Sequence, residues 1–161
     1  MSDKAIVDIA DMKVSSGEDM LITYALGSCI GVAAYDPVAK AGGLLHYMLP
    51  DSKIDSKKGL ERPCMFADTG IMCMFRGLQQ LGCQSNRLIV KIAGGSNILD
   101  PNGAFNIGKN NYLALKKVLW RFSILVKAED VGGSFSRNMT LNLGNGEVRV
   151  RYAGEKEDKL L

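Results

Sequence analysis

The sequence predicts an α+β protein with three layers, in which two main helices cover one face of two stacked, mixed β-sheets. About eight short segments have the apolar or alternating pattern of strands, whereas only two well-separated segments have helical spacing of apolar residues. Both helices must bury an apolar face, most simply against the same sheet. The surplus strands are then expected to stack behind it as a second sheet.

Composition indicates an ordinary globular protein. Its 161 residues are 47% apolar and 23% charged, which favours one domain spanning residues 1–161, with a loose tail from about residue 154 to 161. The 20 basic and 17 acidic residues are interspersed, so nothing predicts nucleic-acid binding. No segment approaches the roughly 20 apolar residues that span a bilayer, and the N-terminus lacks the apolar segment of a signal peptide. We therefore expect a cytoplasmic protein without membrane insertion.

Four strands are expected in the N-terminal part, at residues 5–14, 20–26, 30–35 and 42–49. The last two flank Asp36-Pro37 and predict an antiparallel hairpin. If its loop is centred between Pro37 and Val38, Cys29 lies directly opposite His46, with Cβ atoms about 5 Å apart on the same face. A register shifted by one residue would instead put the two side chains on opposite faces.

The two helices are expected after a polar, exposed loop at residues 51–62. The first begins near Asp68 and ends at Gly82, and the second runs from an Asn106 cap to about Phe122. Further strands are expected at residues 87–93, 124–128, 139–143 and 147–152. The last two flank Asn145-Gly146, a strong hairpin signal. Turns are expected at residues 94–95 and 130–133.

His46 is the only histidine, so a reaction that needs a base near neutral pH must use His46 or a carboxylate. Cys29 follows Gly27 and Ser28 in a turn that enters a strand, where backbone N–H groups can stabilise an oxyanion on an attacked carbonyl. Thr23, on the neighbouring strand, can orient the imidazole as the third group of a triad. Pairing with an imidazolium would lower the pKa of the cysteine to about 3.5–7.5.

Each of these residues also fits a purely structural interpretation. Cysteine is among the most buried residue types, a histidine among Leu44 and Leu45 is often a core residue, and Thr23 can be an ordinary strand threonine. The remaining cysteines are interpreted as reduced, structural thiols: Cys64, Cys73 and Cys83. With one histidine and no CxxC, no metal site is predicted, and no nucleotide-binding motif indicates a cofactor.

Several motifs together resemble the CheD family of chemoreceptor glutamine deamidases. They are Thr23-x-x-Leu26-Gly27-Ser28-Cys29, Asp36-Pro37, Gly43-Leu-Leu-His46-Tyr-Met48-Leu49-Pro50, Phe66-Ala67-Asp68-Thr69, Lys91-Ile-Ala-Gly94-Gly95, Asn106-Ile107-Gly108 and Ala128-Glu129-Asp130-Val-Gly132-Gly133. They span nearly all of the chain in order. The departures are mild: Tyr24-Ala25, Phe66 and Val131 stand where the family often has other residues.

The resemblance implies a three-layer fold and a cysteine hydrolase, with Cys29 as nucleophile, His46 as base and Thr23 as orienting residue. Its reaction would convert glutamines of methyl-accepting chemotaxis receptors to glutamate through a thioester, with possible glutamyl methylesterase activity. The family also implies association with chemoreceptor arrays and with the CheC phosphatase. A catalytically idle adaptor that binds receptors and CheC remains the alternative, and acyl transfer to an amine is a second one.

Overall fold

The computed structural model describes residues 3–98 and 102–161, and in these residues ten strands form two five-stranded sheets. One sheet, called the outer sheet here, contains in spatial order β1 (Lys4–Ile6), β3 (Met20–Leu26), β8 (Arg137–Asn142), β9 (Val148–Tyr152) and β10 (Lys159–Leu160). The other, the central sheet, contains β2 (Asp11–Ser16), β5 (Ala41–Tyr47), β4 (Ile30–Asp36), β6 (Ile89–Gly94) and β7 (Val126–Val131).

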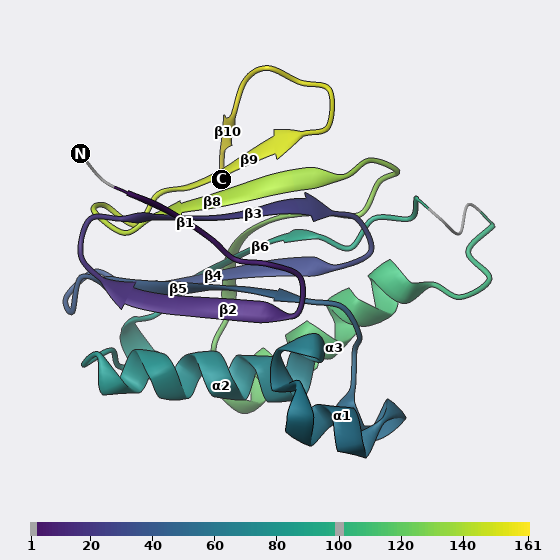
Figure 1. The fold of residues 1–161 in the computed structure, drawn as a ribbon, viewed down its shortest axis with the longest axis horizontal. Coiled ribbons are helices and arrows are strands. Elements are labelled where there is room, and N and C mark those ends of the chain that lie inside the picture. Colours follow the sequence, from purple (N-terminus) through teal and green to yellow (C-terminus); the bar gives the residue numbers. More distant parts are fainter. Residues whose placement is uncertain (1–2, 99–101) are drawn as a thin grey trace.

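The helices lie on the face of the central sheet that points away from the outer sheet (Figure 1). They are α1 (Ser56–Glu61), α2 (Ala67–Gln80) and α3 (Ile107–Arg121). Three single 3₁₀ turns accompany them: η1 (Ser52–Ile54), η2 (Pro63–Met65) and η3 (Ser85–Arg87). The expected α+β fold with three layers and two main helices is confirmed. Among the described residues, no helix is long and apolar enough to cross a membrane.

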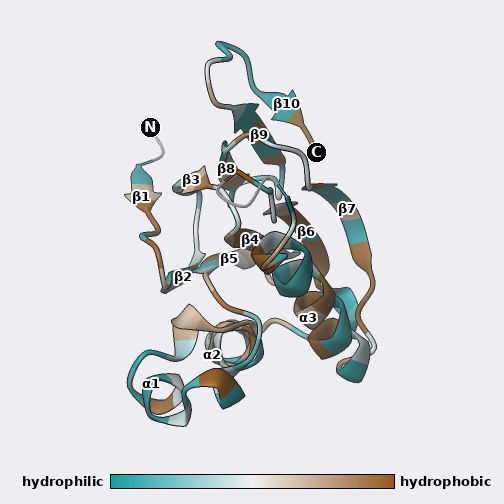
Figure 2. Ribbon diagram, turned by 90° about the vertical axis from the view of Figure 1, so that its right-hand side faces the viewer, coloured by the Kyte–Doolittle hydropathy of each residue, from teal (hydrophilic) through white to brown (hydrophobic). Residues whose placement is uncertain are grey.

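Two apolar clusters fill the spaces on either side of the central sheet. Between this sheet and the helices lie Ile71, Met74, Leu78, Leu115 and Leu119, at helical spacing on α2 and α3. Between the two sheets lie alternate residues of facing strands, among them Leu21, Ala33, Leu44, Met139 and Leu141. Figure 2 shows the apolar colouring of β4 and β6 in the central sheet and of parts of α3. The central sheet is therefore covered on both faces.

The expectation of one continuous first strand at residues 5–14 was wrong, because the structure divides this segment between the two sheets. β1 pairs in parallel with β3 of the outer sheet, whereas β2 pairs antiparallel with β5 of the central sheet. The chain crosses between the sheets at residues 7–10, where Ala10 has a left-handed φ of 59°. An alternating pattern defines which residues face inward, but it does not say to which of two stacked sheets a strand belongs.

The expected hairpin is confirmed, but its expected register was wrong. His46 lies opposite Gly31, and the pairing ends with Ile30 opposite Tyr47. The displacement arises because the loop is centred between Val38 and Ala39, whose N–H groups both donate to Asp36 Oδ1. Since the register moves by two residues rather than one, Cys29 and His46 keep the same face.

Two further segments differ from the expectations. The polar stretch 51–62 contains η1 and α1, whose N-terminal N–H groups are capped by Asp51 and Asp55, rather than an open loop. At the C-terminus, where a loose tail was expected, Lys159–Leu160 pairs with β9, and Lys91 Nζ donates to the Leu161 carbonyl oxygen. Side-chain caps and a two-residue edge strand leave little trace in a sequence pattern.

Candidate active site

Thr23 and His46 meet between the two sheets, and both are fully buried. Thr23 lies on β3 of the outer sheet and His46 on β5 of the central sheet. Thr23 Oγ1 lies 2.7 Å from the Val7 carbonyl oxygen and 2.7 Å from His46 Nδ1. This contact brings together two of the residues that the sequence nominated.

The hydrogen bonds of Thr23 define the tautomer of His46. A hydroxyl has one proton to donate, and the Val7 carbonyl can only accept it. Thr23 Oγ1 must therefore accept from Nδ1–H, which leaves Nε2 with its lone pair in the neutral imidazole. Nε2 is buried and has no hydrogen-bond partner among the described residues. The arrangement leaves one basic ring nitrogen without a hydrogen bond and satisfies the other one.

Burial lowers the pKa of the His46 imidazole to about 4, against a weaker opposing effect of the Asp8 carboxylate. The cause is desolvation, because an apolar site disfavours the charged imidazolium. Thr23 is uncharged and cannot compensate as an aspartate would. His46 is consequently neutral at physiological pH.

Cys29 lies one residue before β4, half-buried, and packs against the apolar cluster between the sheets. Its carbonyl oxygen accepts from Gly95 N at 2.9 Å, which fixes this part of the chain to the end of β6. Burial raises the pKa of the Cys29 thiol, and a backbone hydrogen bond opposes this only partly. The sequence-based expectation of a lowered cysteine pKa was therefore wrong: at rest, the structure holds a thiol and a neutral imidazole.

The turn before Cys29 is held through its carbonyl groups. Gly27 O accepts from both the backbone N and the Oγ of Ser96, each at 2.8 Å, and Ser28 O accepts from Asn111 Nδ2. Beside the turn lies a pocket of about 240 Å³. Its lining includes Ala25, Gly27, Ser28, Ser96, Ile98 and Ile107. Ala25, at a bulge in β3, has a φ of 58°, a strained conformation for a residue with a Cβ.

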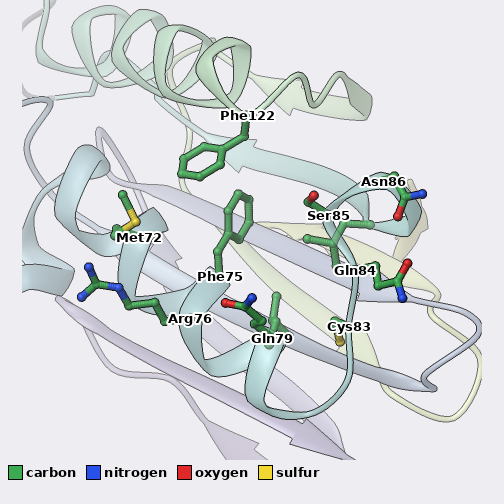
Figure 3. Close-up of a pocket in the computed structure, with 11 residues that line it drawn as sticks. Met72, Phe75, Arg76, Gln79, Cys83, Gln84, Ser85, Asn86 and Phe122 are labelled. Atoms are coloured by element: carbon green, nitrogen blue, oxygen red, sulfur yellow. The ribbon is translucent and has the colours of Figure 1, made fainter.

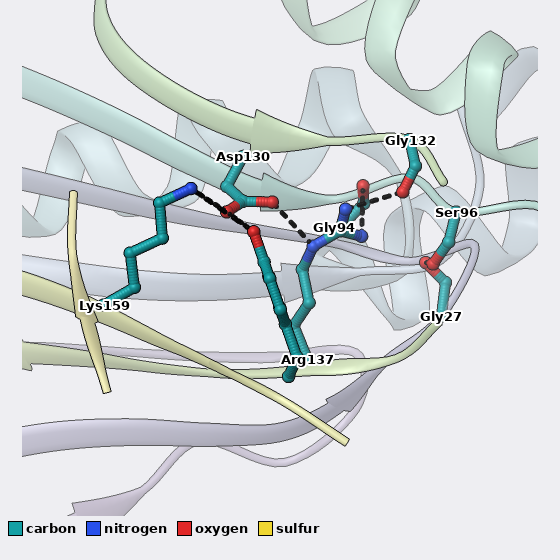
Figure 4. A network of polar contacts seen from close by, with 8 residues as sticks. Gly27, Gly94, Ser96, Asp130, Gly132, Arg137 and Lys159 are labelled. Carbon is teal, nitrogen blue, oxygen red and sulfur yellow. Dashed lines mark hydrogen bonds and ion pairs between the residues drawn. The ribbon is translucent and has the colours of Figure 1, made fainter. Parts of the chain in front are cut away.

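A buried ionic cluster supports the same end of the central sheet, next to the contact between Ser96 and Gly27 (Figure 4). Arg137 of β8 donates through Nε to Asp130 at 2.9 Å, through Nη1 to Gly94 O and through Nη2 to Gly132 O. Because Gly94 precedes the residue that holds the Cys29 carbonyl, this cluster fixes the backbone next to the cysteine. The structure also corrects the expected turn at residues 130–133. Its first two residues belong to a strand, since β7 continues to Val131.

A pocket of about 440 Å³ lies elsewhere, between α2, η3 and the end of α3 (Figure 3). Phe75 and Phe122 meet edge to face in it, with ring centroids 5.1 Å apart. Cys83 and Gln84 line it and bond to the Ala41 carbonyl and to Asp36, at the loop end of the β4–β5 hairpin. Cys29 and His46 are near the opposite end, so this pocket is separate from them.

The other cysteines have no comparable setting. Burial raises the pKa of Cys64 to about 11 and also raises that of Cys83. Within the described residues, no group of three histidine, cysteine or acidic side chains could hold a metal ion. Sequence reasoning missed Asn111 and the Asp130–Arg137 pair, because no local pattern in the sequence marks either of them.

The fold and the site together define a class: three-layer α+β proteins with a cysteine and an uncharged histidine at one end of the central sheet. Residues 48–152 match the family model described as "CheD chemotactic sensory transduction". A protein of Solibacter usitatus (strain Ellin6076) is 48% identical over 157 residues, which cover 97% of this chain and 93% of that protein. One of Syntrophus aciditrophicus (strain SB) is 48% identical over 150 residues, 92% of this chain and 94% of its own length.

The chain belongs to the CheD family, as the resemblance of its motifs predicted. Both relatives carry the name "Probable chemoreceptor glutamine deamidase". The family match begins at Met48 and so does not include Thr23, Cys29 or His46. The longer alignment with the Solibacter protein leaves only 3% of the chain outside it and therefore spans all three residues.

Proposed function

We propose that this protein is a glutamine deamidase that acts on chemoreceptors, with Cys29 as nucleophile, His46 as general base and Thr23 as the residue that orients the imidazole. Family membership supports the reaction. The observation that carries the residue roles is the buried imidazole of His46, whose Nδ1 is held by Thr23 while Nε2 keeps a free lone pair.

The neutral resting state favours proton transfer during attack rather than a preformed ion pair. As Cys29 Sγ bonds to the carboxamide carbon, its proton passes to His46 Nε2, and the carbonyl oxygen becomes an oxyanion. Backbone N–H groups around Gly27 and Ser28 are the proposed donors to this oxyanion. The imidazolium then gives its proton to the departing NH₂ group, so ammonia leaves and a glutamyl thioester remains.

Hydrolysis of the thioester restores the enzyme. Neutral His46 takes a proton from water as the water oxygen attacks the thioester carbon, and the proton returns to Sγ when the C–S bond breaks. Glutamate is the product. A glutamyl methyl ester would pass through the same thioester with methanol as leaving group, so methylesterase activity belongs to the same proposal.

Deamidation has a direct assay, because replacing NH₂ by OH raises the mass of a peptide by about one dalton. The substrate is a purified cytoplasmic fragment of a chemoreceptor, digested and analysed by mass spectrometry after incubation in H₂¹⁸O. We expect ¹⁸O-labelled glutamate at specific glutamines with the wild type and with Cys73→Ala, but none with Cys29→Ala. Labelling that persists in Cys29→Ala would contradict the role of this thiol, and an inactive wild type would contradict the function.

A further inference from the structure

Asn111 is a fully buried polar residue of α3 that the proposed reaction does not use. Its side-chain amide nitrogen donates to Ser28 O at 2.9 Å and to Met48 O at 2.8 Å. Its backbone carbonyl accepts from Tyr47 Oη at 2.6 Å. All three partners are close in sequence to Cys29 or His46, so this single helical residue contacts the chain on both sides of the site.

The two carbonyls lie where the hairpin ladder has ended. Its last pair is Ile30 with Tyr47, beyond which Met48 N donates to Met65 O instead of to the strand opposite. Ser28 has also left the ladder, in the turn that precedes Cys29. The strands therefore separate at this end, and the Asn111 amide replaces the missing backbone pairing with a bridge between them.

We propose that Asn111 is a positioning residue for the reaction, whose side-chain amide sets the distance between the Cys29 turn and the His46 strand. The inference rests on the proposed function. It adds a group on a further element, α3, to residues that lie on β3, β5 and the turn before β4. Asn111 does not touch the reacting atoms but acts through Ser28 and Met48.

The chemistry of the contact requires an asparagine. Two carbonyl oxygens must be bridged by one group with two donors, which an NH₂ supplies and a carboxylate or hydroxyl does not. The same partners assign the amide orientation, because a flipped side chain would face both carbonyls with an oxygen. A short side chain is needed because α3 approaches the sheet end closely: a Cβ on Gly108 would lie 2.6 Å from Gly95 O.

The bridge leaves Asn111 Oδ1 buried with no hydrogen-bond partner among the described residues. An unsatisfied buried acceptor is unfavourable for stability, so packing alone does not explain an amide here. A role in fixing the separated strands gives the residue a reason to be polar.

The test compares Asn111→Ala and Asn111→Asp with Leu115→Ala, which removes a buried apolar side chain one turn later in α3. All are assayed with the receptor fragment at a temperature where circular dichroism shows each to be folded. We expect kcat to fall about 100-fold in both Asn111 variants with little change in KM, because a displacement of about 1 Å is enough for such a loss. Leu115→Ala should retain its kcat.

A second readout does not need substrate. Water that enters between the loosened strands should raise the pKa of His46 from about 4 toward its ordinary 6.5 in Asn111→Ala, but not in Leu115→Ala. NMR titration of the single imidazole measures this shift, and Asn111→Ser serves if the alanine variant does not fold. Equal kcat and equal titration in the Asn111 and Leu115 variants would overturn the inference. An inactive wild type would overturn the proposed function, and the titration would still decide the role of Asn111.

Discussion

Two buried polar contacts join the outer sheet to the central sheet, and they are built in opposite ways. At one, Thr23 of β3 meets His46 of β5, both uncharged. At the other, Arg137 of β8 meets Asp130 of β7 as an ion pair. Each therefore ties the two layers together at a point where an apolar core would otherwise be continuous.

The difference lies in how completely the polar atoms are satisfied. All three nitrogens of the Arg137 guanidinium donate to protein oxygens, and Asp130 also accepts from Tyr152 and Lys159. His46 uses one ring nitrogen and leaves the other without a partner in the described part of the chain. We interpret the fully bonded contact as structural and the half-bonded one as the reactive site, since a base must keep its lone pair available.

Loss of the base should have the largest effect. In His46→Gln, no group can take the Cys29 proton, so we expect deamidation of the receptor fragment to fall about 10⁴-fold. Initial rates followed by ammonia release measure the loss. Cys73→Ala, a change away from the site, is the control, and residual activity in His46→Gln within tenfold of wild type would contradict the assignment.

Arg137→Met tests the other contact between the sheets, the ion pair of Arg137 with Asp130. It leaves Asp130 buried without its main partner, and we expect the free energy of unfolding to drop by about 3–5 kcal/mol. Denaturation by urea measures this. Arg149→Met breaks an exposed pair with Glu147 and should cost less than about 1 kcal/mol. A loss as small in Arg137→Met would show that the cluster does not hold the sheets together.

Thr23→Val removes one hydroxyl with little change in shape. The imidazole then loses the acceptor that selects its Nδ1–H tautomer, and we expect kcat to fall about 100-fold. Thr23→Ser keeps the hydroxyl and should recover most of the activity. Equal rates in the valine and serine variants would mean that the Thr23–His46 hydrogen bond does not matter for the reaction.

The last prediction concerns the dependence of stability on pH. Because the folded pKa of His46 is about 4 and the unfolded one is 6.5, the unfolded chain binds a proton that the folded chain does not in the window between them. Stability should therefore decrease as the pH falls from 6.5 to 4, and less steeply in His46→Gln. The lowered pKa of Asp130 contributes stability above its ordinary 3.8 that is lost at lower pH, in both proteins. Parallel curves from urea denaturation would contradict the neutral, buried imidazole.

Local patterns in the sequence predicted the elements well. β3 has the bounds that were expected, and the layers followed from the apolar faces of α2 and α3. The prediction that Cys29 and His46 share a face of the sheet was correct although the predicted register was wrong. The register differs by two residues, and a shift by an even number of residues keeps both side chains on the same face. Their roles, together with that of Thr23, remain predictions.

What sequence reasoning could not find depends on contacts between distant segments. Nothing local distinguishes Asn111 from an exposed helix residue, since its partners Ser28 and Met48 lie 83 and 63 positions away. The pKa of Cys29 was misjudged for the same reason: burial of its thiol depends on the packing of both sheets, and this burial raises the pKa.

The lone histidine allows the central claim to be tested without any variant. Long-range ¹H–¹⁵N NMR of the imidazole reports its tautomer, and a pH titration of the same signals reports its pKa. The account predicts the Nδ1–H tautomer at neutral pH and a pKa near 4. A proton on Nε2, or a pKa close to the ordinary 6.5, would contradict the assignment of His46 Nε2 as the free base of the site.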